Sequence, residues 1–298
     1  MAVIAMMMTI SASAQFYIYY SDGTVAKVDS ISMVAPEESE QPNPSAGIGV
    51  FSVSATKQVT FSPGNLQYTQ STNTWSFAKN QWDMIGTDNV IGGSVSSNPT
   101  DGDSKEGTAL ADKIDLFGWS TSSTYFGVST SEDNADYAGS FVDWAINQIG
   151  SDVPNTWRTL TYDEWYYLRY TRTNANDVVG MAQVNGINGL IFLPDNWTCP
   201  AGVTFKSGFH GNWGVDDYAA YQTFTTEQWS KLESAGAVFL PTAGVRYGLN
   251  VNYVQYGGGY WSASNGGSSS AANVLGFNAE IGYTNRNYCA SVRLVKDL

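Results

Sequence analysis

The sequence predicts an α+β fold made of short, twisted antiparallel strands, two main helices and long irregular insertions. Short apolar or aromatic runs alternate with long stretches of Asn, Ser, Gly, Thr and Asp, and only two segments carry complete helix-start signals. Charged residues make up 14% of the chain, whereas about 25% is typical of soluble domains. Low charge with so many uncharged polar residues is common in secreted β-rich proteins.

Size and charge narrow the functional classes. The 298 residues suffice for one large domain or two modest ones. The formal net charge is −13, so the chain would be repelled by nucleic-acid phosphates and by anionic membrane surfaces. This charge excludes most nucleic-acid-binding folds.

Residues 1–14 are predicted to be a signal peptide. The run MAVIAMMMTISASA is apolar, ends in small residues before Gln15 and is too short to span a bilayer. It lacks a positive n-region, which predicts a start codon further upstream. The alternative is a buried N-terminal strand. With a signal peptide, the protein is exported to the cell surface or the extracellular space.

Residues 15–35 are expected to form a small β-hairpin. Two runs of β-branched and aromatic residues, 16–20 and 24–34, flank Asp22-Gly23, and Asp-Gly is a strong hairpin signal. Such a hairpin is marginally stable alone. The following residues 36–46 contain the sequence PEESEQPNP, which is typical of a solvated linker.

Residues 47–298 are expected to form the main domain. Strands are predicted at 51–54 and 58–62, followed by a turn at Pro63-Gly64-Asn65. Two polar insertions, 87–112 and 120–136, flank the apolar block 114–119, and a short helix is predicted at 141–145.

Two helices begin with capping boxes. Thr161 is followed three residues later by Glu164, and Thr225 by Gln228; in this motif each side chain bonds the other residue's backbone N–H. Each box is followed at once by a tryptophan, which indicates packing. We therefore expect the frame residues to be structural: Trp165, Trp229, Trp261 and Arg293.

The C-terminal segment predicts a recognition surface. Apolar blocks at 239–246, 260–262 and 291–295 read as buried strands, and the runs between them consist mainly of Asn, Tyr, Ser, Gly and Ala. Tyrosine offers large, rigid contact area at low entropic cost, while Ser, Gly and Asn offer adaptable hydrogen bonds. The alternative is a set of disordered polar loops, against which the interleaved tyrosines argue.

Metal and catalytic signals are weak. The single histidine, His210, cannot build a histidine metal site alone. Two acidic groups could bind calcium or form solvated loops, but both lack the strict calcium-loop pattern: Asp101, Asp103 and Glu106, and Glu132, Asp133 and Asp136. No metal or cofactor is predicted. Cys199 and Cys289 could form one disulfide or remain two free thiols.

Several of these blocks, in this order, resemble the C-type-lectin-fold surface domains of gut Bacteroidetes, which are related to formylglycine-generating enzymes. The resemblance covers about residues 51–298 and rests on residues 61–68, 114–119, 157–161, 164–165, 193–197, 239–244, 260–262 and 291–293. The N-terminal hairpin also resembles a short module of such surface proteins.

Within this fold, the chain resembles the variable proteins of diversity-generating retroelements, in which C-terminal adenines are randomised. An Asn codon changed only at its adenines gives Tyr, Ser, Gly, Asp, Ala or Cys but never a stop; Gln255 and Glu280 are not reachable this way. Asn273, Cys289 and Ala290 are reachable, as are most of the ten residues that we expect to bind ligand. These ten ligand-face residues are Tyr247, Asn250, Tyr253, Tyr256, Ala263, Asn265, Asn278, Tyr283, Asn287 and Tyr288.

Two functions are therefore in view. The first is an adhesin or pilus-tip protein that binds a protein or glycan on another cell or host surface, with pilus subunits as further partners. The second is an enzyme of the formylglycine-generating, cysteine-dependent oxidase type. Cys199 and Cys289 do not form the close pair that such an activity would use. The resemblance does not distinguish a diversified protein from a fixed adhesin.

Overall fold

The computed structural model describes residues 16–19, 25–28, 49–89, 96–97, 112–209, 218–277 and 280–298. The chain divides into two compact units, residues 1–41 and 42–298. The predicted signal peptide and the predicted linker, residues 36–46, lie outside the described residues.

In the first unit, two short strands pair as the sequence predicts. Strand β1 (Phe16–Tyr19) lies antiparallel to β2 (Val25–Val28), with Phe16 opposite Val28 and Tyr19 opposite Val25. This register brackets the predicted Asp-Gly turn.

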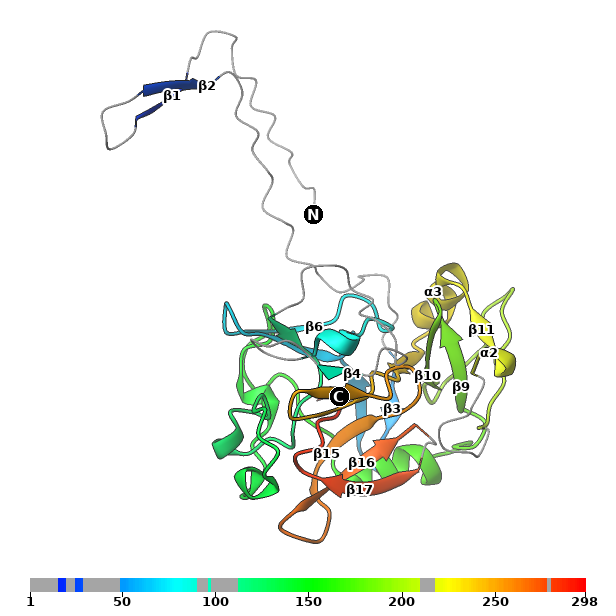
Figure 1. The fold of residues 1–298 in the computed structure, drawn as a ribbon. Coiled ribbons are helices and arrows are strands. Elements are labelled where there is room, and N and C mark those ends of the chain that lie inside the picture. Colours follow the sequence, from blue (N-terminus) through cyan, green and yellow to red (C-terminus); the bar gives the residue numbers. More distant parts are fainter. Residues whose placement is uncertain are drawn as a thin grey trace. The chain divides into compact units, whose positions relative to one another are not determined.

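In the described part of the second unit, the strands form five small sheets that are mainly antiparallel (Figure 1). The first two sheets, in spatial order, are β11-β9-β10-β12 and β13-β14-β7. Their bounds are β7 (Ser96–Ser97), β9 (Val179–Val184), β10 (Ile187–Phe192), β11 (Thr223–Phe224), β12 (Val238–Pro241), β13 (Val245–Tyr247) and β14 (Asn250–Asn252).

The other three sheets are β15-β16-β17, β18-β4-β3 and β6-β5-β8. Their bounds are β3 (Phe51–Ser52), β4 (Gln58–Phe61), β5 (Leu66–Thr69), β6 (Thr74–Phe77), β8 (Lys113–Ile114), β15 (Gly259–Asn265), β16 (Ala271–Gly276), β17 (Ile281–Asn285) and β18 (Val295–Asp297). With the helices below, these sheets establish an α+β fold.

Both predicted capping boxes are present. Thr161 caps α1 (Tyr162–Tyr166), which continues into a π-helical turn, η5 (Tyr167–Thr171), and Thr225 caps α3 (Thr226–Ser234). A third short helix is α2 (Tyr218–Tyr221). No helix in the described ranges has the length and apolar character needed to cross a membrane.

The irregular segments contain short 3-10 turns. They are η1 (Gly86–Asp88), η2 (Ser122–Thr124), η3 (Asn134–Tyr137) and η4 (Trp144–Ile146). The short helix predicted at 141–145 corresponds to η4, which begins three residues later than expected. Asp143 caps η4 through a 3.1 Å bond from the Ala145 N–H.

The β15-β16-β17 sheet lies between two hydrophobic cores. Successive side chains of a strand point to opposite faces, and Tyr260 belongs to one core while Trp261 belongs to the other. On β16, Leu275 packs into the first core and Val274 against the second. Strands β15 and β16 are thus anchored on both of their faces.

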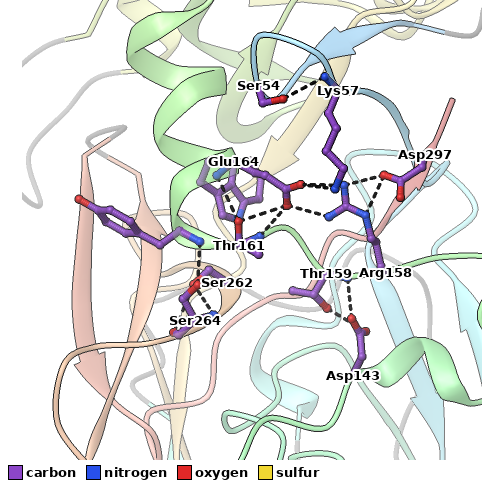
Figure 2. Close-up of polar contacts among 12 residues, drawn as sticks. Ser54, Lys57, Asp143, Arg158, Thr159, Thr161, Glu164, Ser262, Ser264 and Asp297 are labelled. Carbon is purple, nitrogen blue, oxygen red and sulfur yellow. Dashed lines mark hydrogen bonds and ion pairs between the residues drawn. The ribbon is translucent and has the colours of Figure 1, made fainter.

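A charged cluster joins the start of α1 to both ends of the domain (Figure 2). Glu164 accepts hydrogen bonds from Arg158, at 2.7 and 2.9 Å, and from Lys57 at 3.2 Å. Arg158 also pairs with Asp297 on β18 at 2.6 Å. These contacts connect segments about a hundred residues apart in the sequence.

Candidate ligand-binding surface

The frame beneath the C-terminal segment is buried, as predicted. Trp165 and Trp229 are 0% exposed, and Trp261 and Arg293 are 1% exposed. The Trp261 Nε1–H donates to the Phe117 carbonyl at 2.6 Å. The burial expected of the four frame residues is therefore confirmed.

Tyr247 and Tyr288 form a tilted aromatic pair. The backbones of Arg246 and Cys289 exchange hydrogen bonds of 3.1 and 2.7 Å, so the segment before Ala290 runs alongside β13. This pairing brings the two tyrosine rings to a centroid distance of 5.0 Å at 33°. Asn250 lies opposite Tyr247 in the β13-β14 hairpin.

The second group, Tyr253 and Tyr256, projects from the turn after β14. Their side chains are 60% and 51% exposed, and the Tyr256 N–H donates to the Tyr253 carbonyl at 2.9 Å. Tyr253 and Gln255 have φ angles of 62° and 67°, which cost free energy for residues other than glycine. The Gln255 N–H donates to the Thr242 carbonyl at 2.8 Å, which ties the strained turn to β12's end.

The third group lies on the β15-β16-β17 sheet. Tyr283 on β17 is 73% exposed and sits opposite Asn273 of β16. Asn265, at the end of β15, is exposed, and Ala263 is half-buried. Ala263 donates its N–H to the Leu160 carbonyl at 2.8 Å. This group is held by strand pairing rather than by loops.

Asn287, which is expected on the ligand face, is buried, as are two positions that codon randomisation could reach, Cys289 and Ala290. Asn287 is 4% exposed, Cys289 0% and Ala290 2%. Asn287 is buried because its Nδ2–H donates to the Glu132 carbonyl at 2.7 Å and its N–H to Asn134 Oδ1 at 3.2 Å. These partners lie about 155 residues away, so local composition could not reveal them. Asn278 lies outside the described residues.

One loop that was not predicted to belong to the ligand-binding surface lies next to it in the structure. Residues 129–137, here called the acidic loop, lie against the Tyr247–Tyr288 pair. The Tyr247 hydroxyl donates to the Glu132 carbonyl at 3.3 Å. Arg246, which is 1% exposed, donates to the Ser129 carbonyl at 3.1 Å. No short-range pattern indicated this contact.

A second aromatic feature was also missed. Tyr162, Tyr166 and Tyr170 stack along α1 and η5, with centroid distances of 6.0 Å and 4.9 Å. Tyr166 and Tyr170 are 47% and 39% exposed. Their spacing of four residues is the signal that could have identified this helical row.

Both cysteines are free thiols and do not form the disulfide that the sequence left open. Cys199 is exposed and Cys289 is buried. Burial raises the pKa of the Cys289 thiol, although the charge of Arg246 lowers it. A reactive cysteine usually has a lowered pKa and some exposure, and Cys289 has neither.

The carboxylates of the acidic loop have structural hydrogen bonds. Asp133 Oδ1 accepts from the Ala135 N–H at 2.9 Å and caps η3, while Asp136 Oδ2 accepts from Ser131 Oγ at 2.6 Å. Within the described ranges, no group of three or more His, Cys, Asp or Glu residues is placed to hold a metal ion. The other calcium candidates, Asp101, Asp103 and Glu106, lie outside those ranges, as does His210.

Comparison of the chain with protein-family models, with curated proteins and with solved structures found no match. The surface must therefore be interpreted from its own chemistry.

Proposed function

We propose that this chain is a ligand-binding protein whose C-terminal segment supplies the contact surface. One observation carries the proposal: Tyr253, Tyr256, Tyr283 and Tyr288 are between 38% and 73% exposed, on a segment whose frame is almost wholly buried. Exposed aromatic side chains on a rigid support are favourable binding anchors, since little conformational entropy is lost when they are covered.

The expected fold is the C-type-lectin fold, and the expected context is an exported adhesin or pilus-tip protein. The fold is supported by a last strand, β18, that pairs with β4 near the start of the domain. Export is supported by the apolar, small-residue-terminated run before Gln15. Mass spectrometry of the native protein tests export: a mature chain starting at Gln15 is expected, and an intact Met1 in the cytoplasm would contradict it.

Diversification by a retroelement is the finer part of the proposal. Exposed Tyr253, Tyr256 and Tyr288 suit variable positions, whereas buried Asn287 and Cys289 do not, because substitutions there would disturb packing. The genomic test is a neighbouring reverse-transcriptase gene together with an imperfect repeat of the codons for residues 245–293. If the reverse-transcriptase gene and the repeat are both absent, the protein is a fixed adhesin.

The enzymatic alternative gains no support from the described residues. A cysteine-dependent oxidase needs a reactive thiol, and burial disfavours the Cys289 thiolate. Cys199 is exposed, and its thiol donates to the Val203 backbone carbonyl at 3.4 Å.

A protein and glycan array tests the binding proposal. The labelled wild-type chain is compared with the double variants Tyr253→Ala/Tyr256→Ala and Tyr247→Ala/Tyr288→Ala, and with Tyr166→Ala as a matched exposed tyrosine outside the segment. Truncating a central aromatic anchor typically costs about 2 kcal/mol or more, a loss of roughly 30-fold. We expect both double variants to lose wild-type signals while Tyr166→Ala keeps them. Equal signals from all four chains would end the proposal.

A further inference from the structure

The acidic loop forms one wall of the Tyr247–Tyr288 site. Arg246 and Arg286, both buried, hold this loop by donating to its backbone: Arg246 to the Ser129 carbonyl at 3.1 Å, and Arg286 to the Tyr137 carbonyl at 3.2 Å. Both guanidinium groups therefore hold the loop through hydrogen bonds to its backbone carbonyls. The loop is fixed against β13 before any ligand arrives.

The exposed side of this wall is negatively charged. Glu132, Asp133 and Asp136 are all exposed, and in the described ranges none of the three forms an ion pair. Glu132 packs its carboxylate directly over Gly248, in the turn that follows Tyr247. The Glu132 carboxylate thus lies at the turn next to the tilted Tyr247–Tyr288 pair, and the faces of tyrosine rings carry negative electrostatic potential.

A second observation also indicates a donor-bearing ligand. The Asn287 amide is oriented by its Nδ2–H bond to the Glu132 carbonyl, which fixes its other end as an acceptor. That oxygen, Oδ1, has no hydrogen-bond partner within the described ranges, and the residue is 4% exposed. A buried acceptor without a partner costs free energy. Because Oδ1 itself has almost no exposed surface, a ligand N–H group would recover this cost only by displacing the atoms that cover it.

We propose that the ligand of this site is a protein segment that presents an arginine side chain. This inference rests on the proposed binding function and names the ligand's chemistry. A guanidinium group stacks on tyrosine rings and pairs with carboxylates through planar N–H donors. The chain's net charge of −13 would also attract a basic segment and repel an acidic one.

The test uses two labelled peptides of matched shape, Ac-Gly-Arg-Gly-Arg-NH2 and the same peptide with citrulline in place of arginine. Citrulline keeps the planar N–H group but removes the charge. Fluorescence polarisation with the full chain should show weaker binding of the citrulline peptide by about 5-fold or more. Raising the salt concentration should weaken the arginine peptide selectively.

Matched variants locate the binding. Tyr247→Ala/Tyr288→Ala and Glu132→Gln/Asp136→Asn should each weaken the arginine peptide by about 2- to 5-fold. Asp163→Asn/Glu227→Gln removes two exposed carboxylates elsewhere and should leave binding unchanged. Thermal unfolding of every variant shows whether the fold is intact.

Two outcomes overturn the inference. Equal loss in the Asp163→Asn/Glu227→Gln control would show diffuse attraction to an anionic protein. Equal affinity for both peptides would contradict an arginine-bearing ligand. If the Tyr247→Ala/Tyr288→Ala variant still lost its array signals, the proposed function would stand with an uncharged ligand such as a neutral glycan. If the Tyr247→Ala/Tyr288→Ala variant kept both its peptide binding and its array signals, the proposed function itself would be contradicted.

Discussion

Asp115 is a buried carboxyl group that is held by uncharged donors. It accepts from Asn89 Nδ2 at 2.5 Å and from the Ile85 N–H at 3.1 Å. Burial raises the pKa of Asp115 to about 6 despite these hydrogen bonds, and the nearby charge of Asp83 adds to the rise. The carboxylate is therefore accommodated less well in the folded chain than in water.

This raised pKa predicts a pH-dependent stability. Because the folded pKa, about 6, lies above the unfolded value, the stabilisation from protonated Asp115 is complete below about pH 4. It is lost as pH rises through 6, and the whole effect is roughly 3 kcal/mol at most. We expect urea unfolding between pH 4 and 7 to show this decline in the wild type relative to Asp115→Asn. Parallel curves for the two proteins would contradict the assignment.

Loss of the frame residue Trp261 should be costly. Trp261→Ala removes a ring that is 1% exposed together with its hydrogen bond to Phe117, and such truncations cost about 3 to 5 kcal/mol. Tyr288→Ala, at a partly exposed ring, should change the unfolding free energy by about 0.5 kcal/mol or less. An unchanged melting temperature for Trp261→Ala would show that Trp261 does not support the surface.

Residue-level prediction from sequence succeeded where the reason was local. The burial of Trp165 and Trp229 follows from their place one residue after a capping box. Asn287 was predicted to be exposed because its neighbours are polar, yet its burial depends on contacts with Glu132 and Asn134. Such long-range contacts leave no signal in a single sequence.

At the scale of elements, the sequence predicted both capping boxes but not the further partners of Glu164. In the described residues, the Thr225–Gln228 box consists of its two reciprocal hydrogen bonds at an exposed helix start. In the Thr161–Glu164 box, Glu164 also accepts from Arg158 and Lys57 (Figure 2). Burial tends to raise the pKa of Glu164, but hydrogen bonds, foremost those from Arg158, hold it below its ordinary value.

Replacing the last residue of each box, Gln228 or Glu164, separates these contributions. Gln228→Ala should cost about 1 kcal/mol, because the hydrogen bond from the Thr225 N–H is lost, and Glu164→Ala about 2 kcal/mol more, because charged hydrogen bonds are also lost. Because the pKa of Glu164 is lower in the folded chain than in the unfolded chain, this extra stabilisation is complete at pH values above the unfolded pKa and is lost as pH falls. The difference in cost between the two variants should therefore shrink in acid. Equal costs at pH 7 in urea unfolding would show that the ion cluster contributes nothing.

The strands of the C-terminal segment were only partly predictable. Residues 260–262 lie within β15 as expected, but 291–294 are buried without forming a strand, which begins only at Val295. Conversely, β16 and β17 form in a run rich in Asn, Ser and Gly. Here the pairing with β15, which is anchored in two cores, overrides weak strand propensity.

For the whole molecule, the β18-β4-β3 sheet joins the end of the domain to its beginning. Val295 is 0% exposed and lies opposite Phe61 of β4, and its backbone exchanges hydrogen bonds of 2.8 and 2.9 Å with Arg158. Asp297 completes the charged cluster around Arg158. We therefore expect the proposed ligand face to depend on strand pairing that lies outside the face itself.

Truncation of the chain after Leu294 should therefore destabilise the whole domain. The deletion removes one buried valine, worth about 1.5 to 3 kcal/mol, and several hydrogen bonds worth about 1 kcal/mol each, so we expect a loss of about 3 to 6 kcal/mol. Deletion of Leu298 alone, a residue that is 66% exposed, is the matched control and should cost little. Calorimetry should show one lowered transition for the longer truncation, since the β15-β16-β17 sheet shares both cores. A transition unchanged from the wild type would mean that the two ends of the domain fold independently of each other.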